Sequence, residues 1–143
     1  MGRPKKVVTP VIEEVETEFV FGSKFTAEYK LPGDKKFTSH NYDVNIHIVY
    51  DSVKGTESDT AQDAFIVVIN SLNGKNLNEL FENDTRHCFV TPKPDNICRH
   101  IGGYVLDSIA ADDPRKITIE LTAADESDYY SGAKMVINCK KES

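Results

Sequence analysis

The stretch that decides the fold is Thr38-Ser39-His40-Asn41-Tyr42-Asp43-Val44-Asn45-Ile46-His47-Ile48-Val49-Tyr50. From Tyr42 onward, apolar side chains occupy every even position, and the polar Asp43, Asn45 and His47 occupy odd ones. Residues two apart point to the same side of a strand, so this alternation predicts a strand with one buried face. We expect this strand to be the spine of a small α+β domain.

The composition sets the class of protein around this strand. The chain has 143 residues, of which 39% are hydrophobic, and this length and content suit a single domain with one two-layer core. A net charge of -6 argues against a general nucleic-acid or anionic-membrane surface. No apolar run approaches the roughly 20 residues of a membrane span. Three cysteines without CxxC spacing favour free thiols in a reducing compartment, so a cytoplasmic location is expected.

Three further segments read as strands. Glu18 to Leu31 alternates, with an interruption at Gly22-Ser23 that indicates a bulge, and pairs most simply with the opening strand as an antiparallel hairpin. Lys116 to Leu121 and Lys134 to Cys139 alternate in the same way.

Two segments carry the helical period. Thr60 to Leu72 has apolar residues at helical spacing, a capping Thr60 and a stopping Gly74. Pro94 to Ala110 begins with a proline in its first turn, and Lys75 to Pro94 between them reads as a loop.

The order β-β-α-α-β-β predicts an α+β fold: a four-stranded antiparallel sheet with both helices on one face. Such a sheet leaves two open edges, and side-by-side association of copies into a closed ring would cover them. Met1 to Thr17, with Gly2-Arg3-Pro4-Lys5-Lys6 near its start, is expected to be a flexible arm, and residues 18–143 are expected to form the domain. A basic, proline-containing arm is also typical of segments that bind the minor groove of DNA, but the acidic charge of the whole chain argues against this interpretation.

Five motifs follow one another on these elements. They are Phe25-Thr26-Ala27-Glu28-Tyr29-Lys30-Leu31, Thr38-Ser39-His40-Asn41-Tyr42, Leu72-Asn73-Gly74-Lys75-Asn76-Leu77-Asn78, Pro92-Lys93-Pro94-Asp95-Asn96-Ile97-Cys98 and Ile117-Thr118-Ile119-Glu120-Leu121. In this order they resemble motifs of the 6-pyruvoyl-tetrahydropterin synthase and 6-carboxytetrahydropterin synthase family. The resemblance covers about Phe19 to Tyr129. It implies the tunnelling fold and a homo-oligomeric ring, a trimer or hexamer.

The departures from the family pattern concern its chemistry. The family binds zinc through three histidines, which match Tyr29, Thr38 and His40, so only His40 keeps a good zinc ligand. The family's Asp-His pair matches Asn73 and Gly74, and the segment Pro32 to Ser39 lacks the family's cysteine. We therefore expect no zinc, no other cofactor and no catalytic residue.

One ligand-binding feature is retained. The family's glutamate that binds the 2-amino-pyrimidinone edge of a pterin matches Glu120. A carboxylate suits this role because it can accept two N–H bonds from such an edge. Without the family match, alternation predicts that Glu120 is a solvated side chain. A packed strand-end histidine is the favoured interpretation of His40, and a surface histidine that of His47.

Three hypotheses follow from these residues. The leading one is a diverged, non-catalytic protein of this type that binds a pterin- or purine-like ring through Glu120, with His40 as a second candidate ligand residue. The alternatives are a structural or partner-binding oligomer, with the arm as its docking tail, and a tetrahydropterin synthase-type lyase with a rebuilt site.

Overall fold

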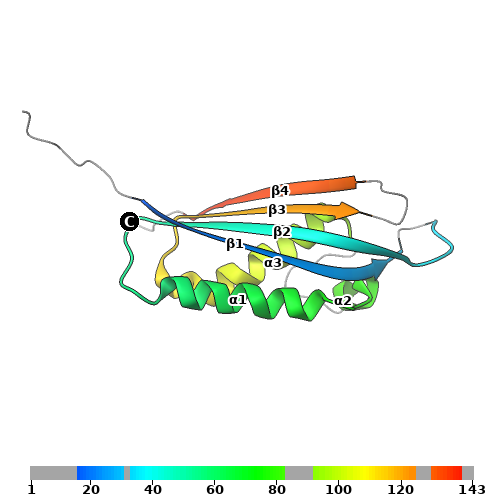
Figure 1. Cartoon of the computed structure of the whole chain (residues 1–143), viewed down its shortest axis with the longest axis horizontal. Coiled ribbons are helices and arrows are strands. Elements are labelled where there is room, and N and C mark those ends of the chain that lie inside the picture. The colour runs from blue at the N-terminus through cyan, green and yellow to red at the C-terminus, as the bar shows by residue number, and fades with distance from the viewer. Residues whose placement is uncertain (1–15, 31–32, 83–91, 125–129, 140–143) are drawn as a thin grey trace, which may run out of the picture.

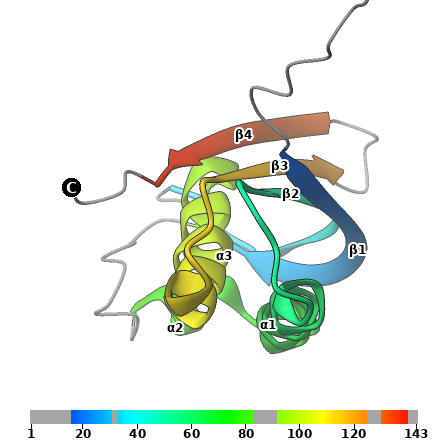
Figure 2. The ribbon, with the colours of Figure 1, turned by 90° about the vertical axis from the view of Figure 1, so that its left-hand side faces the viewer.

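The fold is a single antiparallel sheet with its helices on one face (Figures 1 and 2). The computed structural model describes residues 16–30, 33–82, 92–124 and 130–139. The strands are β1 (Thr17–Tyr29), β2 (Thr38–Tyr50), β3 (Lys116–Ala124) and β4 (Tyr130–Asn138), in the spatial order β1-β2-β3-β4. The helices are α1 (Glu57–Leu72), α2 (Leu77–Glu82) and α3 (Pro94–Ile109), followed by the short 3-10 helix η1 (Ala110–Asp112). The predicted α+β architecture is confirmed.

The opening strand is the spine that its alternation predicted. β2 pairs with β1 on one side and with β3 on the other, so it lies inside the sheet. Its even residues face the helices and are at most 1% exposed from Tyr42 to Tyr50. Its odd residues form part of the opposite face, which the helices leave uncovered (Figure 2). We call this second face the outer face.

The first hairpin has no bulge. Gly22 pairs with Asn45 in an unbroken one-to-one register from Thr17 to Tyr29, so the expected interruption at Gly22-Ser23 is wrong. The glycine has a different role: a Cβ at this position would lie 2.9 Å from Oδ1 of Asn45. The strand needs a small residue here because a neighbouring side chain crosses it.

α1 is a helix despite its β-branched run Phe65-Ile66-Val67-Val68-Ile69. Burial at helical spacing outweighs strand propensity, because Phe65, Val68 and Ile69 face the sheet while Ile66 and Val67 face outward. The helix begins one turn earlier than expected. Thr56, not Thr60, is the N-cap residue, and the Thr60 hydroxyl donates to the Thr56 carbonyl at 3.2 Å. Gly74 follows the C-terminus with a φ of 73°, as its stop role predicted.

α3 crosses the sheet over β3 and β4 at close range. Gly102 faces this sheet, and a Cβ there would lie 3.0 Å from Cδ1 of Ile119 and even closer to Met135. The expected helix over Pro94 to Ala110 and its close glycine packing are therefore confirmed. The segment from Lys75, expected as a loop, instead contains the six-residue helix α2, which Leu77 and Phe81 anchor in the core.

The remaining expectations from the sequence lie partly outside the described residues. Of the arm, Glu16 and Thr17 are described, and Thr17 already belongs to β1. Cys98 and Cys139 are free thiols, as expected, and Cys88 lies outside the described residues. No helix in the described parts of the chain is long and apolar enough to cross a membrane.

Candidate functional site

The hairpin end of the sheet brings together the three positions that match the family's zinc ligands. Tyr29 on β1 lies opposite Thr38 on β2, and His40 is two residues further along the same strand. All three therefore share the helix-facing side of the sheet. His40 is 9% exposed, which makes it a buried polar residue beneath this end of the sheet.

The side chains at these positions form an aromatic stack. The rings of Tyr29 and His40 are 4.4 Å apart between centroids, with planes 12° apart. Phe25 and Tyr42 stack in the same way one pair further along, at 4.6 Å and 13°. His40 was expected to pack on Tyr42, but that ring is tilted and 6.0 Å away, so the closer contact is Tyr29.

This stack does not fit a zinc ion. A metal bound by histidine lies in the imidazole plane, about 2.1 Å from the nitrogen. Stacked rings are held about 3.5 Å apart by van der Waals contact, and the phenolic oxygen of Tyr29 lies in its own ring plane. A zinc ion on His40 would thus be roughly 3.5 Å from that plane, well beyond a zinc–oxygen bond of about 2.1 Å. Thr38 offers only a hydroxyl, a poor zinc ligand.

The positions that match the family's Asp-His pair have a structural role. The Asn73 side-chain oxygen accepts a hydrogen bond from the Thr26 backbone N–H at 3.0 Å, and the Gly74 N–H donates to the Thr26 carbonyl at 2.6 Å. Gly74 also needs its left-handed backbone to make this turn. Both residues therefore close the edge of β1, and neither carries a group that can transfer a proton at neutral pH.

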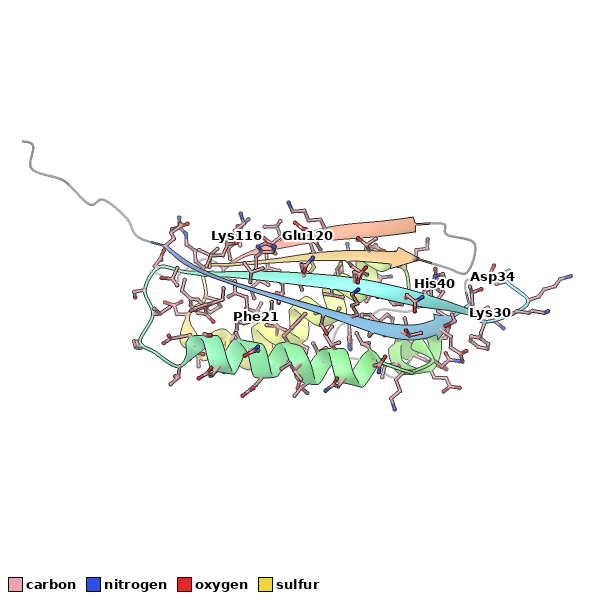
Figure 3. All side chains as sticks on the ribbon, in the orientation of Figure 1. Phe21, Lys30, Asp34, His40, Lys116 and Glu120 are labelled. Carbon is pink, nitrogen blue, oxygen red and sulfur yellow. The ribbon has the colours of Figure 1, made fainter. Side chains whose placement is uncertain are left out.

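Glu120 lies on the other side of the sheet from His40. It is opposite Asn45 on the outer face, its side chain is 48% exposed, and the Lys134 ammonium is 3.8 Å away. Figure 3 shows Glu120 on β3, away from His40, which lies toward the end of the sheet that carries Lys30 and Asp34. Within one chain, the two candidate ligand residues are therefore not brought together.

The surroundings of Glu120 are polar. His47 lies on the outer face, as expected, and its Nδ1 is 2.9 Å from a carboxylate oxygen of Glu18. Thr118 lies opposite His47, between it and β4. Sequence reasoning missed the His47–Glu18 pair, although the register of the hairpin could have placed these residues on one diagonal.

Two hollows open at the end of the sheet away from the hairpin. One, of about 140 Å³, is lined by Asp51, Ser52, Lys54, Glu57, Ala111, Asp112 and Asp113. The other, of about 490 Å³, is lined by Glu16, Glu18, Val49, Arg115, Lys116, Asn138 and Cys139. Neither hollow contains Glu120 or His40. The Arg115 guanidinium spans this end by pairing with Glu16 and Asp51, which ties β1, β2 and β3 together.

Metal-ligating side chains do not cluster in the described parts of the chain: no group of three or more histidine, cysteine, aspartate or glutamate residues there could hold an ion. A zinc site like that of the family would need ligands that the three matching positions do not supply.

Comparison with known proteins supports the architecture rather than the chemistry. No family model matches the chain, and no curated protein matches it in sequence. Among solved structures, 6-pyruvoyl tetrahydropterin synthase of Caenorhabditis elegans superposes with a TM-score of 0.58 and 12% identity, over 91% of this chain and 100% of the other. The enzyme of Plasmodium falciparum gives 0.55 and 10% over 87% and 99%, and that of Plasmodium vivax gives 0.54 and 14% over 88% and 100%. The chain therefore has the fold of the 6-pyruvoyl tetrahydropterin synthases, the tunnelling fold, at a wide distance in sequence.

Proposed function

We propose that this chain is a non-catalytic protein of the tunnelling fold whose copies assemble side by side into a closed ring. Each copy would bind the heterocycle of a pterin- or purine-like ligand through Glu120. The observation that carries the proposal is an exposed carboxylate on the face of the sheet that the helices leave free. In a closed ring of sheets with the helices on the outside of the assembly, the face that we call the outer face of one chain would line the central channel.

Glu120 can exchange its present partner for a ligand. Its contact with Lys134 is a surface ion pair at 3.8 Å between half-exposed side chains, and such pairs contribute about 0–1 kcal/mol. A 2-amino-pyrimidinone edge offers two N–H donors to one carboxylate, which gives shorter and stronger charge-assisted bonds. These bonds gain strength when water is excluded, and ring closure would provide that cover.

Non-catalytic function is supported by what the matching positions do instead. The zinc-ligand positions hold a stacked Tyr29–His40 pair, and the proton-transfer positions close the β1 edge through Asn73 and Gly74. Asn73 and Gly74 carry no side chain that exchanges a proton at neutral pH. The stack holds Tyr29 away from the position of a zinc ligand beside His40.

Calorimetric titration with pterin, guanine and a deazaguanine tests the ligand. We expect wild-type protein to bind at least one of them and Glu120→Gln to bind it at least tenfold more weakly, a loss of about 1.4 kcal/mol or more. Glu28→Gln is the matched control, because Glu28 is also an exposed outer-face glutamate but lies at the hairpin end of β1. Binding that is absent, or equally strong in Glu120→Gln, would rule out this ligand role.

The open sheet edges also favour a second candidate, an assembly scaffold without a small-molecule ligand. β1 and β4 are edge strands of the sheet, and each leaves backbone groups to pair with another chain. Mass measurement in solution separates the candidates from a monomeric binding protein. A ring that forms but binds none of the three compounds would favour the scaffold.

A further inference from the structure

We infer that Asn45, opposite Glu120 on the outer face, is a specificity-determining residue of the Glu120 site. Its side-chain amide donates a hydrogen bond to a carbonyl oxygen of the bound heterocycle. This inference rests on the proposed function and narrows its ligand to 2-amino heterocycles in which a ring N–H stands next to a carbonyl group.

The edge of such a heterocycle has three polar groups in a row: an amino group, a ring N–H and a carbonyl oxygen. The Glu120 carboxylate can accept hydrogen bonds from the first two, but it has no donor for the third. A carbonyl oxygen that loses its water on binding and gains no donor weakens the complex. The donor must therefore come from a residue beside Glu120.

Asn45 is the neighbour of Glu120 on β2. The Thr26 N–H donates to the Asn73 side chain, so the backbone groups of the even residues of β1 point away from β2. Because backbone groups alternate in direction along a strand, the even residues of β2 bond to β1 and the odd residues bond to β3. Asn45 and Glu120 are therefore a hydrogen-bonded pair, with Cα atoms about 5.5 Å apart and both side chains exposed. This spacing places an amide donor beside the carboxylate.

Gly22 sets the direction of the Asn45 amide. It lies opposite Asn45 on β1, and the Asn45 Oδ1 is 2.9 Å from the place that a Cβ of Gly22 would occupy. The Asn45 Nδ2 is not within 4 Å of that place, so the oxygen is directed over β1 and the NH2 group is directed away from it. In the described parts of the chain, no residue accepts a hydrogen bond from this NH2 group.

Another asparagine of the same strand face has different surroundings. Asn41 accepts a hydrogen bond from the Thr26 hydroxyl at 2.9 Å, and its neighbour on β3 is Ala124. Asn41 is thus bonded within the sheet and has no carboxylate opposite it. The combination of an opposed glutamate and a glycine that orients the amide belongs to Asn45, and Asn41 is its matched control.

Lys134 is a second donor beside Glu120, on the β4 side. Its ammonium is 3.8 Å from the carboxylate, and its side chain is 62% exposed. Holding this long, strongly hydrated side chain on one ligand atom costs more conformational entropy than holding a short carboxamide. The geometry therefore favours the Asn45 amide as the donor to the carbonyl.

Calorimetric titration with a sulfur analogue tests the carbonyl contact. Of pterin, guanine and the deazaguanine, the compound that binds most tightly is compared with its analogue that carries sulfur in place of the carbonyl oxygen, 6-thioguanine in the case of guanine. Sulfur is a weak hydrogen-bond acceptor. We expect Asn45→Ala to weaken binding of the oxygen compound about fivefold and that of the sulfur analogue less than about twofold. Asn41→Ala should change neither.

Removal of the 2-amino group separates the roles of the two residues. Hypoxanthine, for example, keeps the ring N–H and the carbonyl of guanine but lacks the amino group. The ratio of affinities with and without the amino group should persist in Asn45→Ala and fall in Glu120→Gln, because only Glu120 contacts that group. A structural disturbance of the site would lower both ratios together.

Gly22→Ala tests the orientation of the amide. The new methyl group would crowd the Asn45 Oδ1, the end of a side chain that can rotate away, so we expect a folded chain by circular dichroism. The variant should lose the preference for oxygen over sulfur, as Asn45→Ala does. In an Asn45→Ala background, Gly22→Ala should add no further loss.

The outcomes separate this inference from the proposed function. Binding that depends on Glu120 but keeps its preference for oxygen over sulfur in Asn45→Ala would overturn the role of Asn45 and leave the proposed ligand standing. Loss of that preference in Lys134→Met, and not in Asn45→Ala, would assign the contact to Lys134 and overturn the inference as well. Binding of none of the compounds would overturn both the inference and the proposed function.

Discussion

The Tyr29 ring lies flat on the His40 ring, with centroids 4.4 Å apart and planes 12° apart, at two of the positions that the motif resemblance matched to zinc ligands. A stack of this kind contributes about 0.5–1.5 kcal/mol beyond the burial of its area. It adds a side-chain contact between β1 and β2 at the end of the sheet where their backbones also pair. The aromatic pair can therefore hold this end of the hairpin together without a metal ion.

Restoring histidines at the matching positions should restore a metal site. Tyr29 and Thr38 are directly opposed, and His40 is on the same face, so Tyr29→His with Thr38→His places three imidazoles within reach of one ion. We expect the double variant to bind one zinc ion per chain and wild-type protein to bind none, as measured by metal analysis after dialysis. Cobalt substitution should add the absorption bands of a tetrahedral site.

The single variant Thr38→His is the control for this reconstruction. It leaves the Tyr29–His40 stack in place and should bind no metal after dialysis. Stoichiometric zinc in wild-type protein would contradict the stacking argument and would favour an enzyme with a rebuilt site.

The hydroxyl groups of Tyr42 and Tyr50 are buried without a hydrogen-bond partner in the described parts of the chain. Burial raises the pKa of both phenols, that of Tyr50 to about 12. An unsatisfied buried hydroxyl costs about 1–3 kcal/mol, so Tyr42→Phe and Tyr50→Phe should leave the free energy of unfolding unchanged or raise it by about 1 kcal/mol. Urea denaturation measures this difference. A loss of more than about 1 kcal/mol would mean that the hydroxyl has a bonded partner in solution.

Gly102 sets the distance between α3 and the sheet. Gly102→Ala should lower the free energy of unfolding by about 1–3 kcal/mol, because the new methyl group would overlap Met135 and crowd Ile119. Met135→Ala in the same chain removes the overlapping atoms. The double variant should therefore be less destabilised than the two single changes predict together, and a purely additive loss would count against the close-packing explanation.

Most of the architecture could be predicted because its signals are local. The alternation around Ile46 and the spacing of Phe65, Val68 and Ile69 each report which face is buried, and burial decided both elements. The short helix α2 could not be predicted, because six residues anchored by Leu77 and Phe81 carry too little period. The start of α1 could not be predicted from apolar spacing either. Its first turn depends on the Glu57 carboxylate, which accepts hydrogen bonds from backbone N–H groups of the preceding loop.

The candidate site was less accessible to sequence reasoning. Alternation could assign Glu120 to the outer face, but its pairing with Lys134 depends on the β3–β4 register. The Tyr29–His40 stack and the edge bonds of Asn73 and Asn78 join segments 11 and about 47 residues apart, and spacing along the chain says nothing of them. Their structural roles became visible only with the strand register in hand.

Glu57 gives the fold a dependence on pH. Its carboxylate accepts hydrogen bonds from the Lys54 N–H at 2.8 and 2.9 Å and from the Gly55 N–H at 3.0 Å. The bond from Gly55, and then that from Lys54, hold the pKa of this carboxyl below its ordinary value. Because the folded pKa is the lower one, the stabilisation is fully present above the ordinary glutamate pKa of about 4.3 and is lost as pH falls through the folded pKa.

Glu57→Gln should remove this contribution, because an amide offers one acceptor oxygen where the carboxylate offers two, and carries no charge. We expect the variant to melt at a lower temperature than wild-type protein at pH 7, and the difference to shrink as the pH falls below about 4. Asp59→Asn is the control, since Asp59 is an exposed acid in the same first turn. The bonds that the Lys54 and Gly55 N–H groups donate go to Glu57 and not to Asp59. A wild-type to Glu57→Gln difference that stays constant between pH 7 and pH 3 would show that the carboxylate charge plays no part in holding the start of α1.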